Sequence, residues 1–140
     1  MSAPVLGIDL GTTNSVVAIA DDTAVRVLTD AEGHRLIPSV VSFHPNGDVI
    51  VGRAARDRRL LDAPNTVYSV KRLIGRPFQS EEVRRAQSRF AFDLTESRSG
   101  GVLVSARNES YTLSEISAFV LREVRRVAED ALGEPCTKAV

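Results

Sequence analysis

The chain has 140 residues, 18 Lys and Arg against 18 Asp and Glu, and 43% hydrophobic residues, a composition typical of one globular domain rather than a disordered tail. A net charge of zero argues against bulk electrostatic binding of nucleic acid, and a single cysteine, Cys136, excludes a disulfide within the chain. The start lacks the basic segment of a secretory signal, and no apolar run approaches the ~18 residues of a spanning helix, so we expect a cytoplasmic protein with neither nucleic-acid nor membrane partners.

The first half of the chain is predicted to be mainly β. Short apolar or β-branched runs lie between turn signals such as Asn46-Gly47, and the first three runs should form a meander of adjacent antiparallel strands. We predict strands at residues 4–10, 15–20, 25–28, 39–43 and 48–51. Residues 52–61 then turn helical, and residues 67–74 form a short apolar-spaced segment that contains Lys71 and Arg72.

The second half of the chain is predicted to mix helices and strands. Glu81 and Glu82 favour a brief helix over residues 80–87, because the helix dipole stabilises anions in the first turn. Strand candidates follow at residues 90–94, 102–106 and 110–112. Thr112 to Glu115 is a capping box, and apolar residues then recur at helical spacing as far as Ala131, before Gly133 ends the helix. Residues 137–140 begin another strand.

The turn between the first two predicted strands is the segment most suggestive of chemistry. It places Asp9 near the end of an apolar strand, beside the small or hydroxylated residues Gly11, Thr12, Thr13 and Asn14. Turn N–H groups can form an anion-binding concavity, threonine hydroxyls add donors, and a glycine lets a phosphate approach the backbone closely. A carboxylate fits beside phosphates when a cation such as Mg²⁺ lies between them, which predicts a cradle for phosphate and magnesium. The alternative is a plain hairpin turn made of good turn formers.

Lys71 is the second candidate. It is one of two lysines, the other being Lys138, in a chain that otherwise uses arginine. A flexible ammonium can follow a moving phosphoryl group, whereas the alternative is a solvated pair of Lys71 and Arg72. The arginine cluster of residues 53–59 is interpreted as a solvated helix face, and neither the common P-loop pattern nor G-x-G-x-x-G occurs.

Several stretches in order resemble the 70-kDa heat-shock chaperones, the DnaK-like ATPases. The segment from Gly7 to Ser15 looks like the opening phosphate-binding hairpin of that family. The further stretches that look like the family are residues 37–43, 51–55 and 65–76 and the end of the final helix at residues 132–134. Because several collinear motifs are more specific than one, the resemblance favours the phosphate cradle over the plain hairpin turn.

The resemblance implies a mixed α/β chain with the actin-like, hexokinase-like ATPase fold. Residues 1–140 would be the N-terminal portion of the nucleotide-binding domain and part of its first lobe. Residues 1–38 and 113–140 would form part of the first subdomain, which opens with the β-hairpin meander. Residues 39–112 would form an inserted, smaller α+β subdomain.

The resemblance also implies roles for single residues. Gly11 to Asn14 match the first phosphate loop, and Asp9 matches the carboxylate that reaches Mg²⁺ through water. Lys71 matches the nucleotide-binding lysine that orients the attacking water and stabilises charge on the γ-phosphate. The implied cofactors are therefore ATP or ADP with Mg²⁺.

The function implied by the resemblance is that of an ATP-dependent chaperone, which hydrolyses Mg-ATP to drive cycles of binding and release of unfolded polypeptides. A J-domain co-chaperone and a nucleotide exchange factor would be further partners of the full-length parent. The family's second phosphate loop, adenosine pocket and peptide-binding domain would lie beyond Val140, so we expect this chain alone to turn over little or no ATP. Two alternatives stay open: a truncated, non-enzymatic interaction module, and an actin-like or sugar-kinase relative that shares the opening hairpin.

Overall fold

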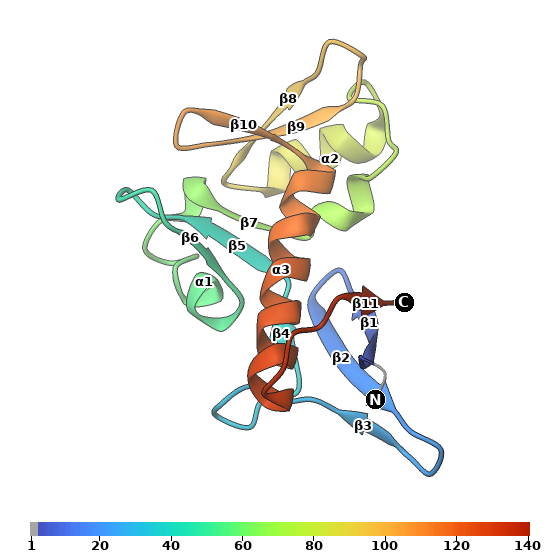
Figure 1. Ribbon diagram of the computed structural model, residues 1–140. Helices are drawn as coiled ribbons and strands as arrows, with labels where there is room; N and C mark the ends of the chain where they lie inside the picture. The colour runs from blue at the N-terminus through green and yellow to red at the C-terminus, as the bar shows by residue number, and fades with distance from the viewer. Residues whose placement is uncertain (1–2) are drawn as a thin grey trace.

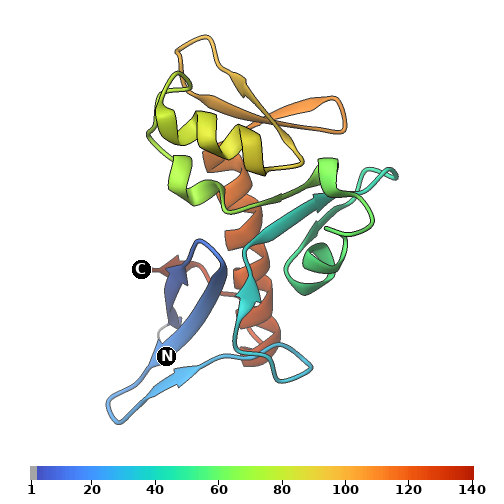
Figure 2. The same ribbon diagram turned by 180° about the vertical axis from the view of Figure 1, so that it is seen from behind.

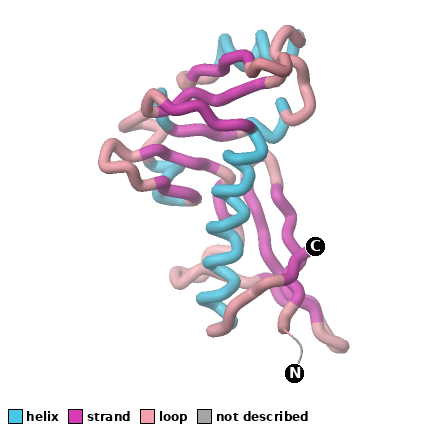
Figure 3. Tube along the Cα trace, turned by 45° about the horizontal axis from the view of Figure 1, so that its top comes forward, coloured by secondary structure: helices cyan, strands magenta, loops and turns pink. Residues whose placement is uncertain are grey.

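The computed structural model describes residues 3–140, in which three small β-sheets surround one long helix, α3 (Leu113–Leu132). This helix contacts strands of all three sheets, and Figure 1 shows it as the central element of the molecule. Figure 3 shows the same arrangement by secondary structure, with strands on several sides of the helix. Within residues 3–140, none of the helices combines the length and the apolar character needed to cross a membrane.

The first sheet has the strand order β11-β1-β2-β3, with β4 beside β2. Its strands are β1 (Val5–Leu10), β2 (Asn14–Ala20), β3 (Val25–Val27), β4 (Ile37–Pro38) and β11 (Lys138–Ala139). The first three form the antiparallel meander that the sequence predicted, and β11 pairs parallel to β1. β4 was not predicted, because the strand expected in this region began at Ser39. Its pairing with β2 brings residues 37–39 beside the end of the first hairpin (Figure 2).

The other two sheets are antiparallel and three-stranded. One has the order β6-β5-β7 and the other the order β10-β9-β8. Their strands are β5 (Val40–Phe43), β6 (Val49–Val51), β7 (Thr66–Tyr68), β8 (Asp93–Glu96), β9 (Val102–Ala106) and β10 (Glu109–Thr112). The remaining helices are α1 (Arg53–Asp57), α2 (Glu81–Arg89) and two short 3₁₀ turns, η1 (Ala63–Asn65) and η2 (Val70–Leu73).

The capping box of α3 is present as predicted. The Thr112 hydroxyl accepts a hydrogen bond from the Glu115 N–H, and the Glu115 carboxylate accepts one from the Thr112 N–H, both at 3.0 Å. These two bonds satisfy backbone donors that a helix start leaves without partners. At the other end Gly133 takes the left-handed conformation with φ of 70°, which glycine adopts without a steric penalty.

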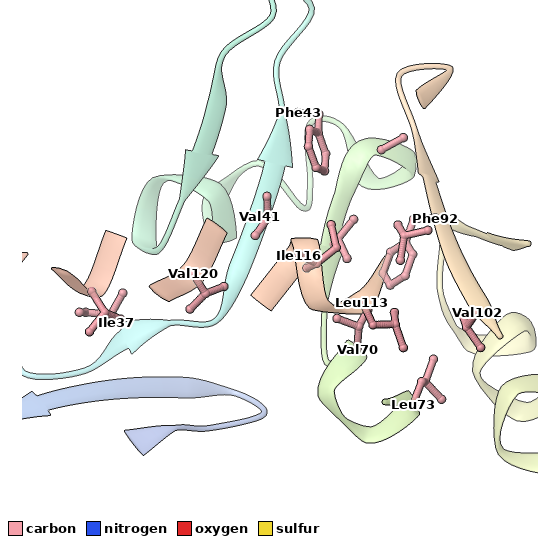
Figure 4. Close-up of a cluster of buried hydrophobic side chains, with 14 of the residues drawn as sticks. Ile37, Val41, Phe43, Val70, Leu73, Phe92, Val102, Leu113, Ile116 and Val120 are labelled. Carbon is pink, nitrogen blue, oxygen red and sulfur yellow. The ribbon is translucent and has the colours of Figure 1, made fainter. Parts of the chain in front are cut away.

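One face of α3 supplies the centre of the core. Its buried residues are Leu113, Ile116, Val120, Val124, Val127 and Ala128. In Figure 4, Val41 lies near Val120 and Ile116, while Leu113 gathers with Val70 and Leu73. Burial of each large aliphatic side chain contributes about 1.5–3 kcal/mol, so this stripe is the main reason that the three sheets stay together. Ala131, which the periodicity placed on the stripe, is exposed because the helix faces solvent there.

A partly buried polar cluster joins the β6-β5-β7 sheet to the β10-β9-β8 sheet. We define this Asp62 cluster as Asp62, Arg58, Arg107, Asn65 and Ser42. The Asp62 carboxylate accepts hydrogen bonds from Arg58 at 3.3 Å, from Asn65 at 2.9 Å and from Arg107. Arg58 also donates to the Ser42 hydroxyl at 2.9 Å. The prediction that all the arginines of residues 53–59 face solvent was therefore wrong for Arg58, whose side chain is only 18% exposed.

Two predicted elements differ from the structure. The helix expected over residues 52–61 ends at Asp57, and the chain then turns so that the Asp62 N–H bonds to the Arg58 carbonyl at 2.8 Å. The strand expected at residues 90–94 begins only at Asp93. Phe90 and Phe92 precede it, and their rings stack with centroids 4.5 Å apart. The alternation of these two residues in the sequence therefore reflects an aromatic contact rather than a strand.

Candidate phosphate-binding site

The turn between β1 and β2 is unusually tight at Gly11. A Cβ atom placed on this residue would lie 2.2 Å from the backbone oxygen of Asn14, a distance at which the backbone must shift. We predicted a glycine that lets a phosphate approach. The structure adds a different reason, because the side chain is excluded by the turn itself.

Ser39, which follows β4, fixes two carbonyl groups of this turn. Its N–H donates to the Thr13 oxygen at 2.9 Å, and its hydroxyl donates to the Gly11 oxygen at 2.9 Å. The same hydroxyl lies 3.0 Å from the hydroxyl of Ser15, which is completely buried at the start of β2. Carbonyl groups that would repel an anion are therefore held against the protein.

The donors of the turn are left open. In the structure of residues 3–140, the backbone N–H groups of Thr12 and Thr13 form no hydrogen bond, and neither do their hydroxyls. Thr13 is exposed and Thr12 is half-buried. A half-buried backbone donor such as the Thr12 N–H normally finds a partner, and the exposed Thr13 N–H is accessible to solvent. Both donors are therefore available to a ligand or water.

Lys71 lies at the edge of the same turn. The chain passes Ser69 in a left-handed conformation and enters η2, in which Val70 and Leu73 are buried. Because those two residues anchor the short helix, Lys71 and Arg72 are left exposed between them. The Lys71 ammonium donates a hydrogen bond to the Leu10 oxygen at the end of β1, across 61 residues of sequence. The structure thus brings Lys71 to the predicted phosphate loop.

Asp9 is exposed on β1, directly before Leu10 and opposite Val16 of β2. In the part of the chain that the structure describes, its carboxylate forms no ion pair, and no cluster of three or more metal-ligating side chains occurs. A single exposed carboxylate suits contact with Mg²⁺ through the waters that this ion retains, rather than a cage of protein ligands.

The size and the charge of two surface hollows limit where an anion could bind. Between the turn, residues 68–71 and α3 lies a cavity of about 20 Å³, which has room for one water but not for a phosphate. A hollow of about 470 Å³ beside α1 and the second half of α3 is larger. It is lined by five carboxylates, those of Asp30, Glu32, Asp57, Glu123 and Asp130, and by two guanidinium groups, those of Arg53 and Arg126. Because carboxylates outnumber arginines there, this hollow disfavours phosphate, and an anion is expected at the open donors of the turn instead.

A comparison with protein families identifies the family of the chain. The family model described as Hsp70 protein matches residues 5–140. The chain belongs to the Hsp70 family. Hsp70 proteins are chaperones that bind ATP or ADP with Mg²⁺ and hydrolyse ATP, and the mixed α/β structure is that of part of their actin-like ATPase lobe. The predicted family and fold are thereby confirmed.

Two residues of this candidate site were missed in the sequence. In the sequence, Ser15 and Ser39 are typical of strand residues, and each belongs to a stretch that resembles the family without being assigned a role of its own. Their contacts with each other and with Gly11 span 24 and 28 residues. The only local signal is Pro38, which cannot donate to β2 and so makes Ser39 the first N–H available after β4.

Proposed function

We propose that residues 9–14 and Lys71 form the first phosphate loop and the phosphate-binding lysine of an ATP-hydrolysing Hsp70 chaperone. The observation that carries this proposal is the polarity of the turn. Its Gly11 and Thr13 carbonyls are bonded to Ser39, whereas the N–H and hydroxyl donors of Thr12 and Thr13 are open. Such a turn attracts an anion without any surplus of basic residues.

Each residue of the proposed site would contribute a different interaction with the nucleotide. The open donors of Thr12 and Thr13 would bind phosphate oxygens and orient the nucleotide, and the Asn14 amide would add a further donor. Lys71 would place a positive charge near the outermost phosphate, where negative charge develops during transfer, and would orient the attacking water. Asp9 would hold the hydration waters of Mg²⁺, and the ion, when bound, neutralises phosphate charge.

The wider cycle of the whole protein belongs to the same proposal. ATP hydrolysis would drive binding and release of unfolded polypeptides in the cytoplasm, with a J-domain co-chaperone and a nucleotide exchange factor as partners. We also propose that residues 1–38 and 113–140 belong to one subdomain and that residues 39–112 form an inserted one. The support is that the first sheet uses residues of the outer segments, whereas the other two sheets lie within the inserted one.

The substitution Lys71→Ala, made in the whole gene product, tests the proposed role of this lysine. We expect phosphate release from ATP to fall about 10²–10³-fold, as for loss of one preorganised donor, with a smaller change in the Kd for Mg-ATP. Lys138→Ala is the matched control, because Lys138 is the other lysine and lies exposed on β11. Equal turnover in Lys71→Ala and Lys138→Ala would contradict the proposal. Binding of a partner protein without any Mg-ATP binding would support the non-enzymatic module instead.

Asp9→Asn tests the magnesium contact separately. The variant should need a higher Mg²⁺ concentration for half-maximal ATP binding, while its affinity for ATP without magnesium stays the same or rises, because a negative charge is removed. Asp22→Asn is the control, since Asp22 is exposed in the turn between β2 and β3. An unchanged Mg²⁺ dependence would exclude Asp9 from the metal site.

A further inference from the structure

Ser39 makes more contacts with the phosphate loop than any residue to which the sequence assigned a role. Through one N–H and one hydroxyl it bonds to the carbonyl oxygens of Gly11 and Thr13, each at 2.9 Å. The loop has only these two residues and Thr12 between the strands. One residue, Ser39, therefore holds the first and the last carbonyl of the three-residue loop through its hydroxyl and its N–H.

The direction of the hydroxyl hydrogen bonds follows from counting protons. A serine hydroxyl has one proton to donate, and Ser39 gives its proton to the Gly11 oxygen. In the 3.0 Å contact between the two serine hydroxyls, Ser15 must therefore be the donor and Ser39 the acceptor. Because Ser15 is completely buried, this contact gives its hydroxyl a partner and at the same time orients the hydroxyl of Ser39.

The direction of the loop N–H groups follows from the planarity of the peptide bond. No cis peptide bond occurs in residues 3–140, and in a trans peptide the C=O of one residue and the N–H of the next point in opposite directions. With the Gly11 carbonyl turned toward Ser39, the Thr12 N–H points away from it. With the Thr13 carbonyl turned toward Ser39, the Asn14 N–H also points away.

We propose that Ser39 is the positioning residue of the phosphate loop. By holding the two carbonyls it aims the N–H groups of Thr12 and Asn14 at the phosphates, and the buried Ser15 hydroxyl keeps the Ser39 hydroxyl in the orientation that does so. Ser39 itself touches no substrate in this role. The proposal rests on the proposed function, in that it needs the loop to bind the phosphates of a nucleotide.

The test compares two ligands, Mg-ATP and adenosine, on Ser39 variants of the protein as its gene encodes it. Ser39→Ala should weaken Mg-ATP binding about tenfold, because the Gly11 carbonyl loses its partner and the peptide can rotate, and it should leave the Kd for adenosine unchanged. Ser39→Thr keeps the hydroxyl and should restore most of the affinity. Ser88→Ala is the matched control, since the Ser88 hydroxyl also donates to a backbone carbonyl, that of Arg85 at 2.7 Å, on exposed α2.

The outcomes separate this inference from the proposed function. If the unmodified protein binds Mg-ATP no more tightly than adenosine, the loop is not a phosphate site and the proposed function fails. If the unmodified protein prefers Mg-ATP but Ser39→Ala binds it equally well, only the positioning role fails. An equal loss for Mg-ATP and adenosine would show general damage to the fold and would also overturn the positioning role.

A second pair of variants keeps the inference testable if Ser39→Ala does not fold. Ser15→Ala leaves the bonds from Ser39 to the loop in place and removes only the group that orients its hydroxyl, so we expect a loss of about threefold in Mg-ATP affinity. In the double variant that combines Ser15→Ala with Ser39→Ala, the two losses of Mg-ATP affinity should not add, because both substitutions act through the Ser39 hydroxyl. If Ser15→Ala has an unchanged affinity for Mg-ATP, the proposed orientation of the Ser39 hydroxyl by Ser15 is wrong.

Discussion

The phosphate loop and the Asp62 cluster are both built from polar atoms, but they use them differently. In the cluster, the Asp62 carboxylate is 16% exposed and accepts from three side chains, and Arg107 also donates to the Phe43 oxygen at 2.9 Å. In the loop, Ser39 bonds the carbonyls and the neighbouring donors stay open. A polar group whose partners are all within the protein contributes to the fold, whereas a set of open donors is available to a ligand.

This difference predicts that changes in the loop act on binding and changes in the cluster act on stability. The loop lies at the exposed end of a hairpin whose register is already set by the β1–β2 ladder. The cluster instead joins η1, β5 and the turn between β9 and β10.

The largest effect is expected for Gly11→Ala. The added Cβ would lie 2.2 Å from the Asn14 oxygen, so the loop backbone must move. A displacement near 1 Å of groups that position a substrate lowers the reaction rate about 10²-fold. We expect ATP turnover to fall by that factor, measured by phosphate release, together with a weaker affinity for Mg-ATP, measured by calorimetric titration. Gly7→Ala is the control, because its Cβ would meet the Ala18 oxygen at an ordinary 3.7 Å. Normal binding by Gly11→Ala would remove the contrast between the two regions.

The next effect is expected for Asp62→Ala. Two arginines would lose their shared carboxylate in a partly buried site, which should lower the free energy of unfolding by about 2 kcal/mol after allowance for solvent screening. Urea unfolding measures this change, and Asp57→Ala, at an exposed position of α1, is the control. The folded fraction should bind Mg-ATP normally. A selective loss of nucleotide affinity would mean that the cluster belongs to the site.

A smaller effect on stability is expected for Thr112→Ala. The variant leaves the Glu115 N–H at the start of α3 without its side-chain partner, which costs about 1 kcal/mol. Thermal unfolding should show the loss, and Thr137→Ala, at an exposed position after the helix, should not. Because α3 contacts all three sheets, one cooperative transition at a lower temperature is expected. Two separate transitions would show that the sheets do not share this helix as a common core.

The smallest effect is a pH dependence at Glu129. Hydrogen bonds from the Cys136 N–H and from Arg125 lower the pKa of this carboxyl below its ordinary value of 4.5. A carboxyl with a lowered pKa in the folded state stabilises the fold above pH 4.5 and loses this contribution as the pH falls below that value. In Glu129→Gln the decline of the unfolding free energy between pH 4.5 and 3 should be less steep. Glu134→Gln, with an exposed carboxyl nearby, is the control.

The elements that local sequence determines were predicted well. The capping box of Thr112 and Glu115, the left-handed Gly133 and the antiparallel meander all depend on residues close in sequence, and the structure has them. The early end of α1 could not be predicted, because it depends on Arg58 turning toward Ser42 and Asp62 instead of toward solvent.

The site was predictable in part for the same reason. Gly11, Thr12 and Thr13 are adjacent and their chemistry is apparent together, and Lys71 was conspicuous as one of two lysines. Their proposed roles in nucleotide binding stay predictions. Ser39 could not be recognised, because its importance comes from carbonyl groups, which every residue has, and the fold alone decides which carbonyls it meets.

The separation of the loop from its partners has a consequence for how the protein matures. The β1–β2 hairpin is local and can form early, but Ser39 and Lys71 arrive from 28 and 61 residues farther along the chain. Contacts of such long range form late in folding, since their loops must close first. Until then the Gly11 carbonyl lacks the hydrogen bond from Ser39 that holds it in the folded structure. A newly made chain would therefore acquire affinity for phosphate only when its folding is nearly complete, and nucleotide binding would report that completion.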